Sequence, residues 1–489
     1  MNSPTSRWQN QFWAYVGNEF RGILGNARNY ALGEVAARGV VILTIPIFTY
    51  LLSAAEYGVF QVYQSYSAIL VVLLTLNFHA SAGRYYYDEP QDYGAFLGTS
   101  LAGSLLFLSV ALVGIGLYRE QFAALLGIPY LLVLLLPVQI VAAIFHSIFT
   151  QICVSREQSA RRAWFIALHT WLGVGLGIGF ISLFEEDRYL GPVLGVVAAA
   201  VPAAVYAARP LFRELRWAFS RDHVRYIFSY SVALSPYMLS TIFLGQIDRV
   251  MINKFRGGEE AGVYSIAYNI AMSLALLSQV LNQALIPQWF RLMRAGKFGA
   301  VDAVVDRAFR ITLLGAAGLV FFSVDAMRLL IDSRYHEALY LIPVITVGYV
   351  FEAVFRIYGH SIGFARRMIF VALVGVTAGS LNVVLNLVYI PTYGYEAAAY
   401  TTVISYAVMA GLAWLVASRL LKQRITPARV LLAPTLAFSA GVVVYALLTA
   451  SELEGAVLLL AKGAAFLGTG AVILRFRHML GSDEQEPVS

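Results

Sequence analysis

Three pairs of oppositely charged residues interrupt long apolar stretches of the sequence. They are Glu34 with Arg38, Asp248 with Arg249, and Glu352 with Arg356. In a helix, residues four apart share one face, whereas adjacent residues point about 100° apart. An ionisable group at the centre of a membrane costs about 2.5 to 3.5 kcal/mol on insertion scales, so it usually faces a cavity or a charged partner. The pattern predicts either a polar cavity or ion pairs that brace a helix bundle.

The two kinds of charge suit different chemistry. A guanidinium presents a rigid fork of donors that matches phosphate oxygens, and it stays charged at any accessible pH. A buried carboxyl group can exchange a proton or bind another cation as a cavity opens. We expect the arginines to bind an anion. The carboxylates are predicted either to exchange H⁺ or Na⁺ or to pair permanently with the arginines.

Composition excludes a soluble protein. Of the 489 residues, 59% are hydrophobic and only 13% are charged, and the mean hydropathy is +0.69, which together indicate an integral membrane protein. The net charge of +7 would suggest a nucleic-acid partner in a soluble chain, but here the basic residues fall between apolar runs. We therefore expect no nucleic acid.

Motifs for metal or nucleotide chemistry are missing from the sequence. The single cysteine, Cys153, excludes an intrachain disulfide and a cysteine metal cluster, and there is no Walker, zinc-binding or DxD motif. We expect no cofactor, no metal site and no enzymatic activity.

The elements that position the charged pairs are predicted to be membrane-spanning helices. A hydrocarbon core about 30 Å thick needs roughly 20 apolar residues per helix. About fourteen runs meet this requirement, at residues 29–51, 57–80, 94–117, 129–153, 163–184, 189–208, 226–253, 262–286, 308–331, 338–360, 368–390, 395–418, 430–449 and 455–474. The predicted fold class is therefore all-α and polytopic.

Lysine and arginine are concentrated on one side of this predicted topology. With the N-terminus in the cytoplasm, most of the 35 basic residues fall in cytoplasmic segments, whereas acidic stretches such as 185–187 and 451–455 fall outside. This bias sets the orientation of membrane helices. Both termini are predicted to be cytoplasmic.

One motif occurs twice in the chain. The stretch "EYGVFQVYQSY" at 56–66 has a counterpart, "EAGVYSIAYNI", at 260–270, and segments 186–195 and 390–399 match at the same offset of 204 residues. Two matches at one spacing predict an internal duplication. Six helices per copy is an even number, so both copies enter the membrane in the same direction. The repeated glycines, Gly58 and Gly262, are predicted to let the chain turn tightly into each helix.

The duplication predicts four regions. Two six-helix lobes related by a pseudo-two-fold repeat occupy residues 1–208 and 226–420, and a cytoplasmic amphipathic linker joins them at 209–225. Residues 421–489 carry two further helices and a cytoplasmic tail.

Three segments carry a resemblance to a known family: "EYGVFQVY", "QIDRVMINKFRGGEEAGVYSIAYNI" and "NVVLNLVYIPTYGYEAAAYTTVISYAV". In these segments and in its helix count, the sequence resembles the polysaccharide transport family, which includes the Wzx-type O-antigen flippases. This family is part of the multidrug/oligosaccharidyl-lipid/polysaccharide exporter superfamily. The resemblance implies alternating access of two lobes in the bacterial cytoplasmic (inner) membrane. It implies that the cargo is an undecaprenyl-pyrophosphate-linked oligosaccharide, such as an O-antigen, capsule or exopolysaccharide repeat unit.

Roles for individual residues follow from this resemblance. The arginines Arg38, Arg249 and Arg356 are expected to bind the pyrophosphate, and Glu34, Asp248 and Glu352 to couple to H⁺ or Na⁺ or to pair. Sugar contacts are expected from Gln61, Tyr63, Gln64, Tyr264, Tyr268 and Asn269, which occupy corresponding parts of the two repeats. Hydrogen bonds between helices explain these six residues equally well.

Alternatives for partners and function stay open. Besides membrane lipids, a polysaccharide polymerase and a chain-length regulator are candidate partners. A multidrug cation exporter of the same superfamily is one alternative function, although its cargo would be repelled by buried arginines. A membrane polysaccharide polymerase or ligase is the other, although the predicted outward loops are short.

Overall fold

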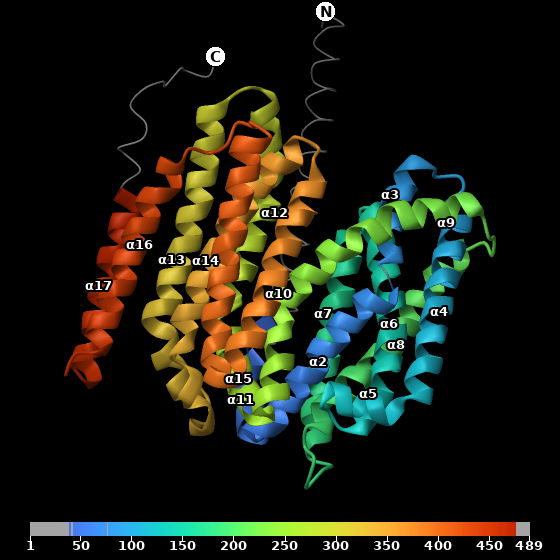
Figure 1. Cartoon of the computed structure of the whole chain (residues 1–489), viewed down its shortest axis with the longest axis horizontal. Helices are drawn as coiled ribbons and strands as arrows, with labels where there is room; N and C mark the ends of the chain where they lie inside the picture. The colour runs from blue at the N-terminus through green and yellow to red at the C-terminus, as the bar shows by residue number, and fades with distance from the viewer. Residues whose placement is uncertain (1–38, 41–42, 76, 476–489) are drawn as a thin grey trace, which may run out of the picture.

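The computed structural model describes residues 39, 40, 43–75 and 77–475, and every regular element in these ranges is helical (Figure 1). Residues 43–51 are helical and lead into α2. The α-helices are α2 (Ala54–Thr75), α3 (Phe78–Asp88), α4 (Tyr93–Leu117), α5 (Arg119–Leu126), α6 (Tyr130–Ser155), α7 (Ser159–Ile181), α8 (Leu190–Glu214), α9 (Arg221–Ile227), α10 (Ala233–Arg256), α11 (Gly258–Ala271), α12 (Ser273–Arg294), α13 (Phe298–Leu330), α14 (Leu341–Phe364), α15 (Met368–Leu415), α16 (Ala428–Thr449) and α17 (Gly455–Arg475). Short π-helical turns (Phe228–Val232 and Val416–Leu420) and a 3₁₀ helix (Ser333–Ala338) join some of them.

The described residues contain 12 helices that are long and apolar enough to cross a membrane. The prediction of an all-helical polytopic membrane protein is thereby confirmed. The first of the fourteen predicted helices, at 29–51, lies mostly outside the described residues.

One of the 12 spans accounts for two predicted helices. It runs through α15 to Leu420 and has 53 residues, which corresponds to about 80 Å of helix and is more than twice the hydrocarbon thickness. It breaks at Gly394, whose φ of 63° and ψ of −150° are open to glycine but strained for other residues. The predicted runs 368–390 and 395–418 therefore form two passes that meet at Gly394.

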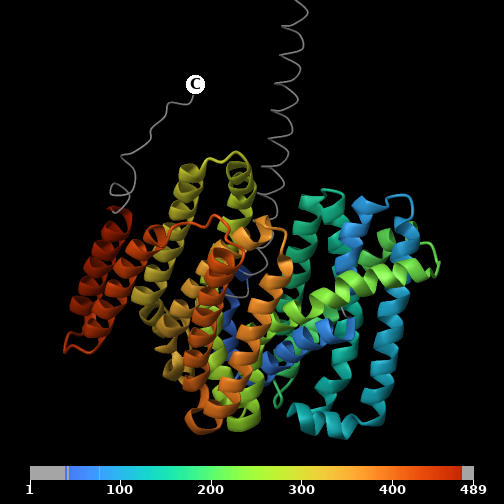
Figure 2. The same ribbon diagram turned by 45° about the horizontal axis from the view of Figure 1, so that its top comes forward.

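The helices form two groups (Figures 1 and 2). We call α3 to α9 the N-terminal group and α10 to α17 the C-terminal group. Helix α2 runs between them and packs against α6 of the first group and against α10 and α11 of the second. In both views α16 and α17 stand at the edge of the molecule away from the N-terminal group.

The closest contact between the repeated segments joins Gly58 of α2 to Gly262 of α11. A Cβ atom at Gly58 would lie 2.9 Å from the backbone nitrogen of Gly262, and one at Gly262 would lie 2.9 Å from the nitrogen of Gly58. Both glycines lie within helices. The prediction that they allow tight turns is therefore wrong: glycine is present because two backbones meet where a side chain has no room.

The glutamates of the repeated motif make equivalent contacts. Glu56 Oε1 accepts the backbone N–H of Arg188, next to the start of α8, at 2.8 Å. Glu260 Oε2 accepts the backbone N–H of Tyr395, just after the break in α15, at 3.3 Å. Each glutamate thus connects the first matched segment to the second one of the same copy.

The predicted linker, 209–225, comprises the end of α8, the non-helical residues 215–220 and the start of α9. It lies along α4, because Arg216 N donates to Gly94 O at 2.9 Å and Thr99 Oγ1 donates to Ala218 O at 2.7 Å. The division into four regions stays a prediction.

Substitution of either repeated glycine should test the α2–α11 contact. We expect Gly58→Ala and Gly262→Ala to lower the thermal unfolding midpoint, because overpacking of a close contact costs about 1 to 3 kcal/mol. The matched control is Gly179→Ala in α7, where an added Cβ has no atom within 4 Å. The control should be neutral or slightly stabilising, since alanine favours the helix. Equal midpoints for all three variants in detergent would contradict the contact.

Candidate functional site

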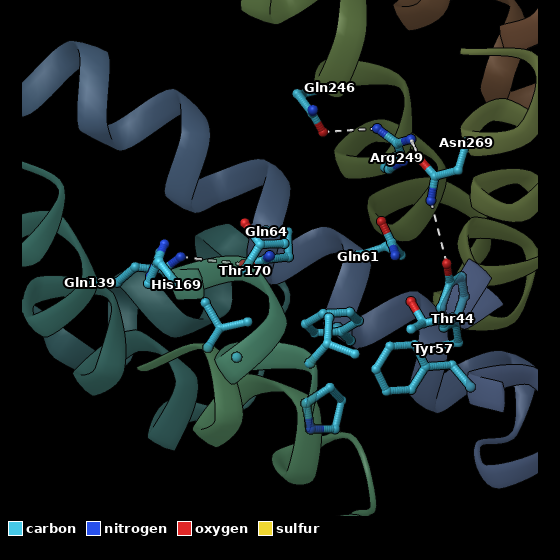
Figure 3. Close-up of a pocket in the computed structure, with 16 residues that line it drawn as sticks. Thr44, Tyr57, Gln61, Gln64, Gln139, His169, Thr170, Gln246, Arg249 and Asn269 are labelled. Atoms are coloured by element: carbon cyan, nitrogen blue, oxygen red, sulfur yellow. Dashed lines mark hydrogen bonds between the residues drawn. The ribbon is translucent and has the colours of Figure 1, made fainter. Parts of the chain in front are cut away.

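A cavity of about 330 Å³ lies where α2 faces both helix groups (Figure 3). Helices α2, α6, α7, α8, α10 and α11 contribute to its wall, as do residues just before α2. The lining residues are Thr44, Phe48, Tyr57, Phe60, Gln61, Gln64, Gln139, His169, Thr170, Gly173, Val174, Pro192, Val196, Gln246, Arg249 and Asn269. Amide and hydroxyl groups therefore alternate with apolar surface around one arginine.

Arg249 is only 2% exposed, and its hydrogen-bond partners are neutral. Its Nη2 donates to Asn269 Oδ1 at 2.7 Å, its Nη1 to Gln246 Oε1 at 2.8 Å, and its Nε to Ser265 Oγ at 3.1 Å. The ring of Tyr268 lies 4.6 Å from the guanidinium carbon. Within the described ranges no carboxylate forms an ion pair with Arg249, so its charge can still be matched by an anion in the cavity.

The wall opposite Arg249 is polar as well. Gln139 and His169 lie together on this side, across the cavity from Arg249 and Asn269 (Figure 3). Gln139 Nε2 donates weakly to Gln64 Oε1 at 3.4 Å, and Gln139 Oε1 has no hydrogen-bond partner within the described part of the chain. A buried acceptor without a partner is costly, so this wall is suited to a ligand that carries hydroxyl donors.

Four of the residues predicted for the site line the cavity: Gln61, Gln64, Arg249 and Asn269. Asn269 also donates from Nδ2 to the Tyr57 hydroxyl at 3.4 Å. The structure thus brings predicted residues of α2, α10 and α11 together around one space.

The predicted tyrosines, Tyr63, Tyr264 and Tyr268, are not among the residues that line the cavity. Tyr268 donates to Leu244 O at 3.2 Å and supports Arg249 through its ring, and Tyr264 donates to Asp248 Oδ2 at 2.8 Å. Tyr63 is fully buried elsewhere in α2. The sugar contacts proposed for these three rings stay a prediction.

Asp248 lies inside the C-terminal group and points away from the cavity. Its carboxylate accepts hydrogen bonds from Asn386 Nδ2 at 2.6 Å, Thr402 Oγ1 at 2.8 Å and the Tyr264 hydroxyl at 2.8 Å. Asp248 and Arg249 contact different partners, as adjacent helical positions predict. This carboxylate ties α10 to α11 and to both halves of α15.

The pair of Glu352 and Arg356 does not line the cavity. In α14, Arg356 Nη2 and Glu352 Oε1 form an ion pair at 2.5 Å, and Glu352 is 8% exposed. Glu34 and Arg38 fall outside the described residues. Ion exchange by Asp248 and Glu352 stays a prediction.

Sequence reasoning missed several lining residues: Gln139, His169, Thr170 and Gln246. Each is a polar residue within a predicted membrane-spanning run, and this was the signal that could have identified it. Three of them come from α6 and α7, outside the repeated motif on which the prediction concentrated.

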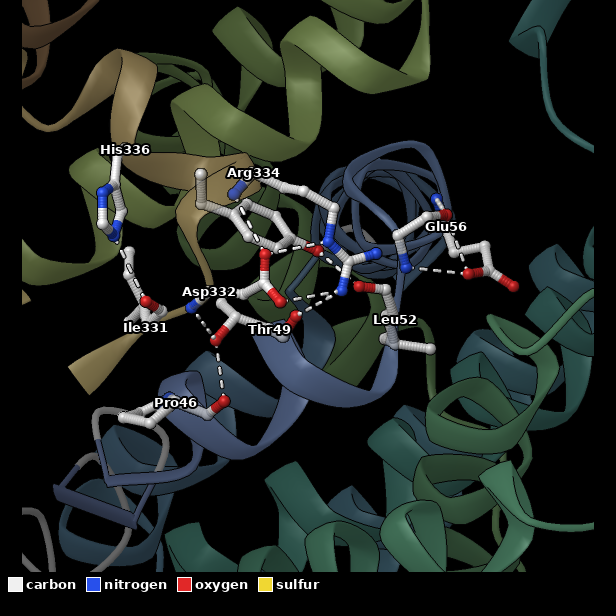
Figure 4. Close-up of polar contacts among 10 residues, drawn as sticks. Pro46, Thr49, Leu52, Glu56, Ile331, Asp332, Arg334 and His336 are labelled. Carbon is white, nitrogen blue, oxygen red and sulfur yellow. Dashed lines mark hydrogen bonds and ion pairs between the residues drawn. The ribbon is translucent and has the colours of Figure 1, made fainter. Parts of the chain in front are cut away.

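Contacts between the segment before α2 and the connection from α13 to α14 lie next to the cavity (Figure 4). Arg334 Nη2 donates to Thr49 O at 3.4 Å, and the Tyr335 hydroxyl donates to Leu52 O at 3.0 Å. The ring of Tyr335 also meets Tyr57, a lining residue, edge-on with centroids 6.0 Å apart.

An ion pair lies beside these contacts. Arg334 donates from Nε to Asp332 Oδ1 at 2.9 Å, and hydrogen bonds from Arg334 lower the pKa of Asp332 to about 2. Asp332 therefore stays ionised above about pH 3, and these contacts do not respond to pH through this carboxylate.

Comparison with known proteins gives one family match and several relatives. The family described as "Polysaccharide biosynthesis protein" matches residues 23–293, which is more than half of the chain. The chain is 21% identical over 391 residues to "Probable low-salt glycan biosynthesis flippase Agl15" of Haloferax volcanii. That alignment covers 77% of this chain and 79% of the relative.

Solved transporters share the fold. A lipid II flippase, MurJ, in an inward closed conformation matches with a TM-score of 0.65 at 12% identity, covering 90% of this chain and all of MurJ. A MATE transporter in its straight conformation matches with a TM-score of 0.57 at 15% identity, covering 82% of this chain and 96% of the other. The helical fold is therefore of the MurJ and MATE type.

The structural role of Asp248 can be tested through stability. We expect Asp248→Ala to lower the thermal unfolding midpoint strongly, because each donor left without a partner costs about 1 to 3 kcal/mol. Glu186→Ala, which removes an exposed carboxylate from a loop, is the control and should leave the midpoint unchanged. Unchanged stability of Asp248→Ala, combined with a transport rate that has lost its pH dependence, would instead assign Asp248 to ion exchange.

Proposed function

The chain belongs to the polysaccharide biosynthesis protein family, and we propose that it is a flippase for lipid-linked oligosaccharide. Its cargo is an undecaprenyl-pyrophosphate-linked repeat unit of an O-antigen, capsule or exopolysaccharide. The prediction that the chain is a transporter and not an enzyme agrees with its matches, which are described as flippases and multidrug transporters.

The buried charge of Arg249 carries this proposal. Its hydrogen-bond partners are neutral, so a diphosphate entering the cavity can accept hydrogen bonds from the guanidinium without breaking an ion pair. In a low-dielectric site such charge-assisted bonds are stronger than neutral ones. A diphosphate is the anionic group of the proposed cargo.

The amide groups around Arg249 support the proposal that the cargo carries sugars. Gln61, Gln64 and Gln139 present donors and acceptors to the cavity, and Tyr57 and Phe60 add aromatic surface. Sugars are bound by this combination of hydrogen bonds and ring contacts. The cavity thus has groups for both the diphosphate and the first sugars of the glycan.

The same observations weigh against the alternatives. A multidrug exporter of organic cations is disfavoured, because a buried arginine repels a cationic cargo. A polymerase or ligase needs an extracytoplasmic region to hold catalytic groups. The connections between the described α-helices are short, the longest being 416–427, which contains a π-helical turn, and 331–340, which contains the 3₁₀ helix.

Transport is proposed to occur by alternating access of two six-helix lobes, residues 1–208 and 226–420, in the bacterial inner membrane. With both termini in the cytoplasm, the contacts of Thr49 with Arg334 and of Leu52 with Tyr335 lie on the extracytoplasmic side. These contacts must break when the cavity opens outward. Lipid approaches from the opposite, cytoplasmic side.

Removal of the guanidinium tests the pyrophosphate site. We expect Arg249→Ala to reduce translocation of a fluorescent undecaprenyl-pyrophosphate oligosaccharide in proteoliposomes by about 10- to 100-fold, because hydrogen bonds to charged groups contribute about 1.5 to 3 kcal/mol. Arg249→Lys should recover part of the rate, since it keeps the charge but not the fork.

The control for that measurement is Lys254→Ala, which removes an exposed positive charge from the same helix. It should transport at the wild-type rate. Wild-type rates for a folded Arg249→Ala variant would rule out the diphosphate role.

A reversible crosslink tests alternating access. Thr49 Oγ1 and Asp332 N are 3.4 Å apart, so the pair Thr49→Cys and Asp332→Cys should form a disulfide. We expect the oxidised double variant to stop translocation, and reduction to restore it. Cys153 is fully buried and should not interfere. Each single-cysteine variant serves as a control, and full transport by the crosslinked protein would contradict the mechanism.

A further inference from the structure

Helices α7 and α8 are tightly packed at one end and separate towards the other. Near the loop that joins them, a Cβ at Gly177 would lie 3.0 Å from Pro192 Cα, and one at Gly191 would lie 2.6 Å from Ile181 N. The other halves of the two helices enclose a groove of about 460 Å³ next to Pro202, a proline inside α8. The tight end has no room for a ligand, so any occupant lies between residues 161–172 and 199–206.

The groove is open to the surrounding lipid. Trp164 and Leu168 of α7 line it, and they are 76% and 67% exposed on a helix that can span a membrane. Ala199 and Ala203 of α8 form a shallow floor, and Tyr206 forms one wall. An apolar groove with aromatic side chains at its sides and small residues at its base can bind an apolar chain.

The groove shares a wall with the central cavity. His169 lines both spaces, and it also lines a smaller cavity of about 210 Å³ together with Gln139. In Figure 3, His169 lies beside Gln139, on the side of the cavity opposite Arg249. His169 therefore lies between the lipid-facing groove and the polar site.

A cationic side chain marks one end of the groove. Arg161 lines it, is exposed, and has its guanidinium over the rings of Phe149 at 5.1 Å and Tyr206 at 5.7 Å. It also donates from Nε to the Tyr206 hydroxyl at 3.3 Å. In the predicted topology this end is cytoplasmic, at the level of lipid phosphates. Stacked arginines recognise phosphate well, so charge complementarity favours a phosphate-bearing lipid.

We propose that the α7–α8 groove is a lateral docking site for the polyprenyl chain of the lipid-linked cargo, with Arg161 receiving its diphosphate at the membrane surface. This inference rests on the proposed function. The chain stays in the groove while the diphosphate passes His169 towards Arg249. An ordinary phospholipid carries no glycan and does not need access to the central cavity. The wall that the groove shares with this cavity therefore favours a lipid that carries a glycan.

Photolabelling tests the occupant directly in the wild-type protein. An undecaprenyl diphosphate analogue with a diazirine in its prenyl chain should label peptides covering residues 161–172 and 199–206. Excess undecaprenyl phosphate should compete, whereas excess phosphatidylglycerol should not. Equal competition by phosphatidylglycerol, or labelling confined to other helices, would overturn the proposal.

A groove-filling variant tests the consequence for transport. We expect Ala203→Trp to lower translocation about tenfold or more while leaving inorganic pyrophosphate binding unchanged, because it fills the floor but does not touch the central cavity. The matched control, Val201→Trp, lies on the same helix outside the groove, is 48% exposed, and should transport normally.

The outcomes separate this inference from the proposed function. If Ala203→Trp transports normally while Arg249→Ala does not, the groove proposal fails and the flippase proposal stands. If the wild-type groove is labelled selectively but no lipid-linked oligosaccharide is translocated, the groove stands and the flippase proposal fails. Because labelling uses the wild-type protein, the proposal remains testable even if Ala203→Trp does not fold.

Discussion

The close approach of α2 and α11 is the constraint on which the rest of the site depends. At Gly58 and Gly262 the two helices meet backbone to backbone. This proximity brings the Tyr57 hydroxyl to Asn269, and Asn269 in turn accepts from Arg249. Any side chain at the crossing would move α2 away and would break this link between the two helix groups. A steric requirement near the start of α2 thus bears on the position of the charge that Asn269 holds about two turns along α11 from Gly262.

The environment of Arg249 differs from that of Arg356 in a way that bears on function. Arg356 has its charge neutralised by Glu352 at 2.5 Å, so an anion must compete with a carboxylate for it. Arg249 is held by amide, hydroxyl and carbonyl groups, which stabilise the ion without cancelling its charge. Asp248 is next in sequence, but its oxygens are used by Tyr264, Thr402 and Asn386. Because Asp248 binds these three residues and not Arg249, the positive charge of Arg249 in the cavity wall is not neutralised by an ion pair.

Much of the fold could be predicted from the sequence, because hydropathy and length determine which segments can cross a membrane. The break in α15 was predictable as well, since Pro391 and Gly394 interrupt its apolar run. The site was predicted only in part. Hydropathy does not report how a helix is rotated, so it could not show that Gln139 and His169 face the same space as Arg249. The repeated glycines were misinterpreted because a glycine near a helix start is compatible with a turn and with a close crossing, and only the partner helix distinguishes the two.

A lipid-linked glycan places two incompatible demands on its transporter. Transfer of each methylene of its chain into water costs about 0.8 kcal/mol, so a long prenyl chain cannot follow the glycan into a polar cavity. The glycan, in turn, cannot leave its hydrogen-bond partners for hydrocarbon. A polar cavity can bind the glycan while the prenyl chain stays in lipid only if a thin wall separates the cavity from the lipid. The wall at His169, which lines both a groove of about 460 Å³ and a cavity of about 330 Å³, has this property. Three of the four polar side chains that the repeat-based prediction missed, Gln139, His169 and Thr170, come from α6 and α7, on the side of the cavity that borders this groove.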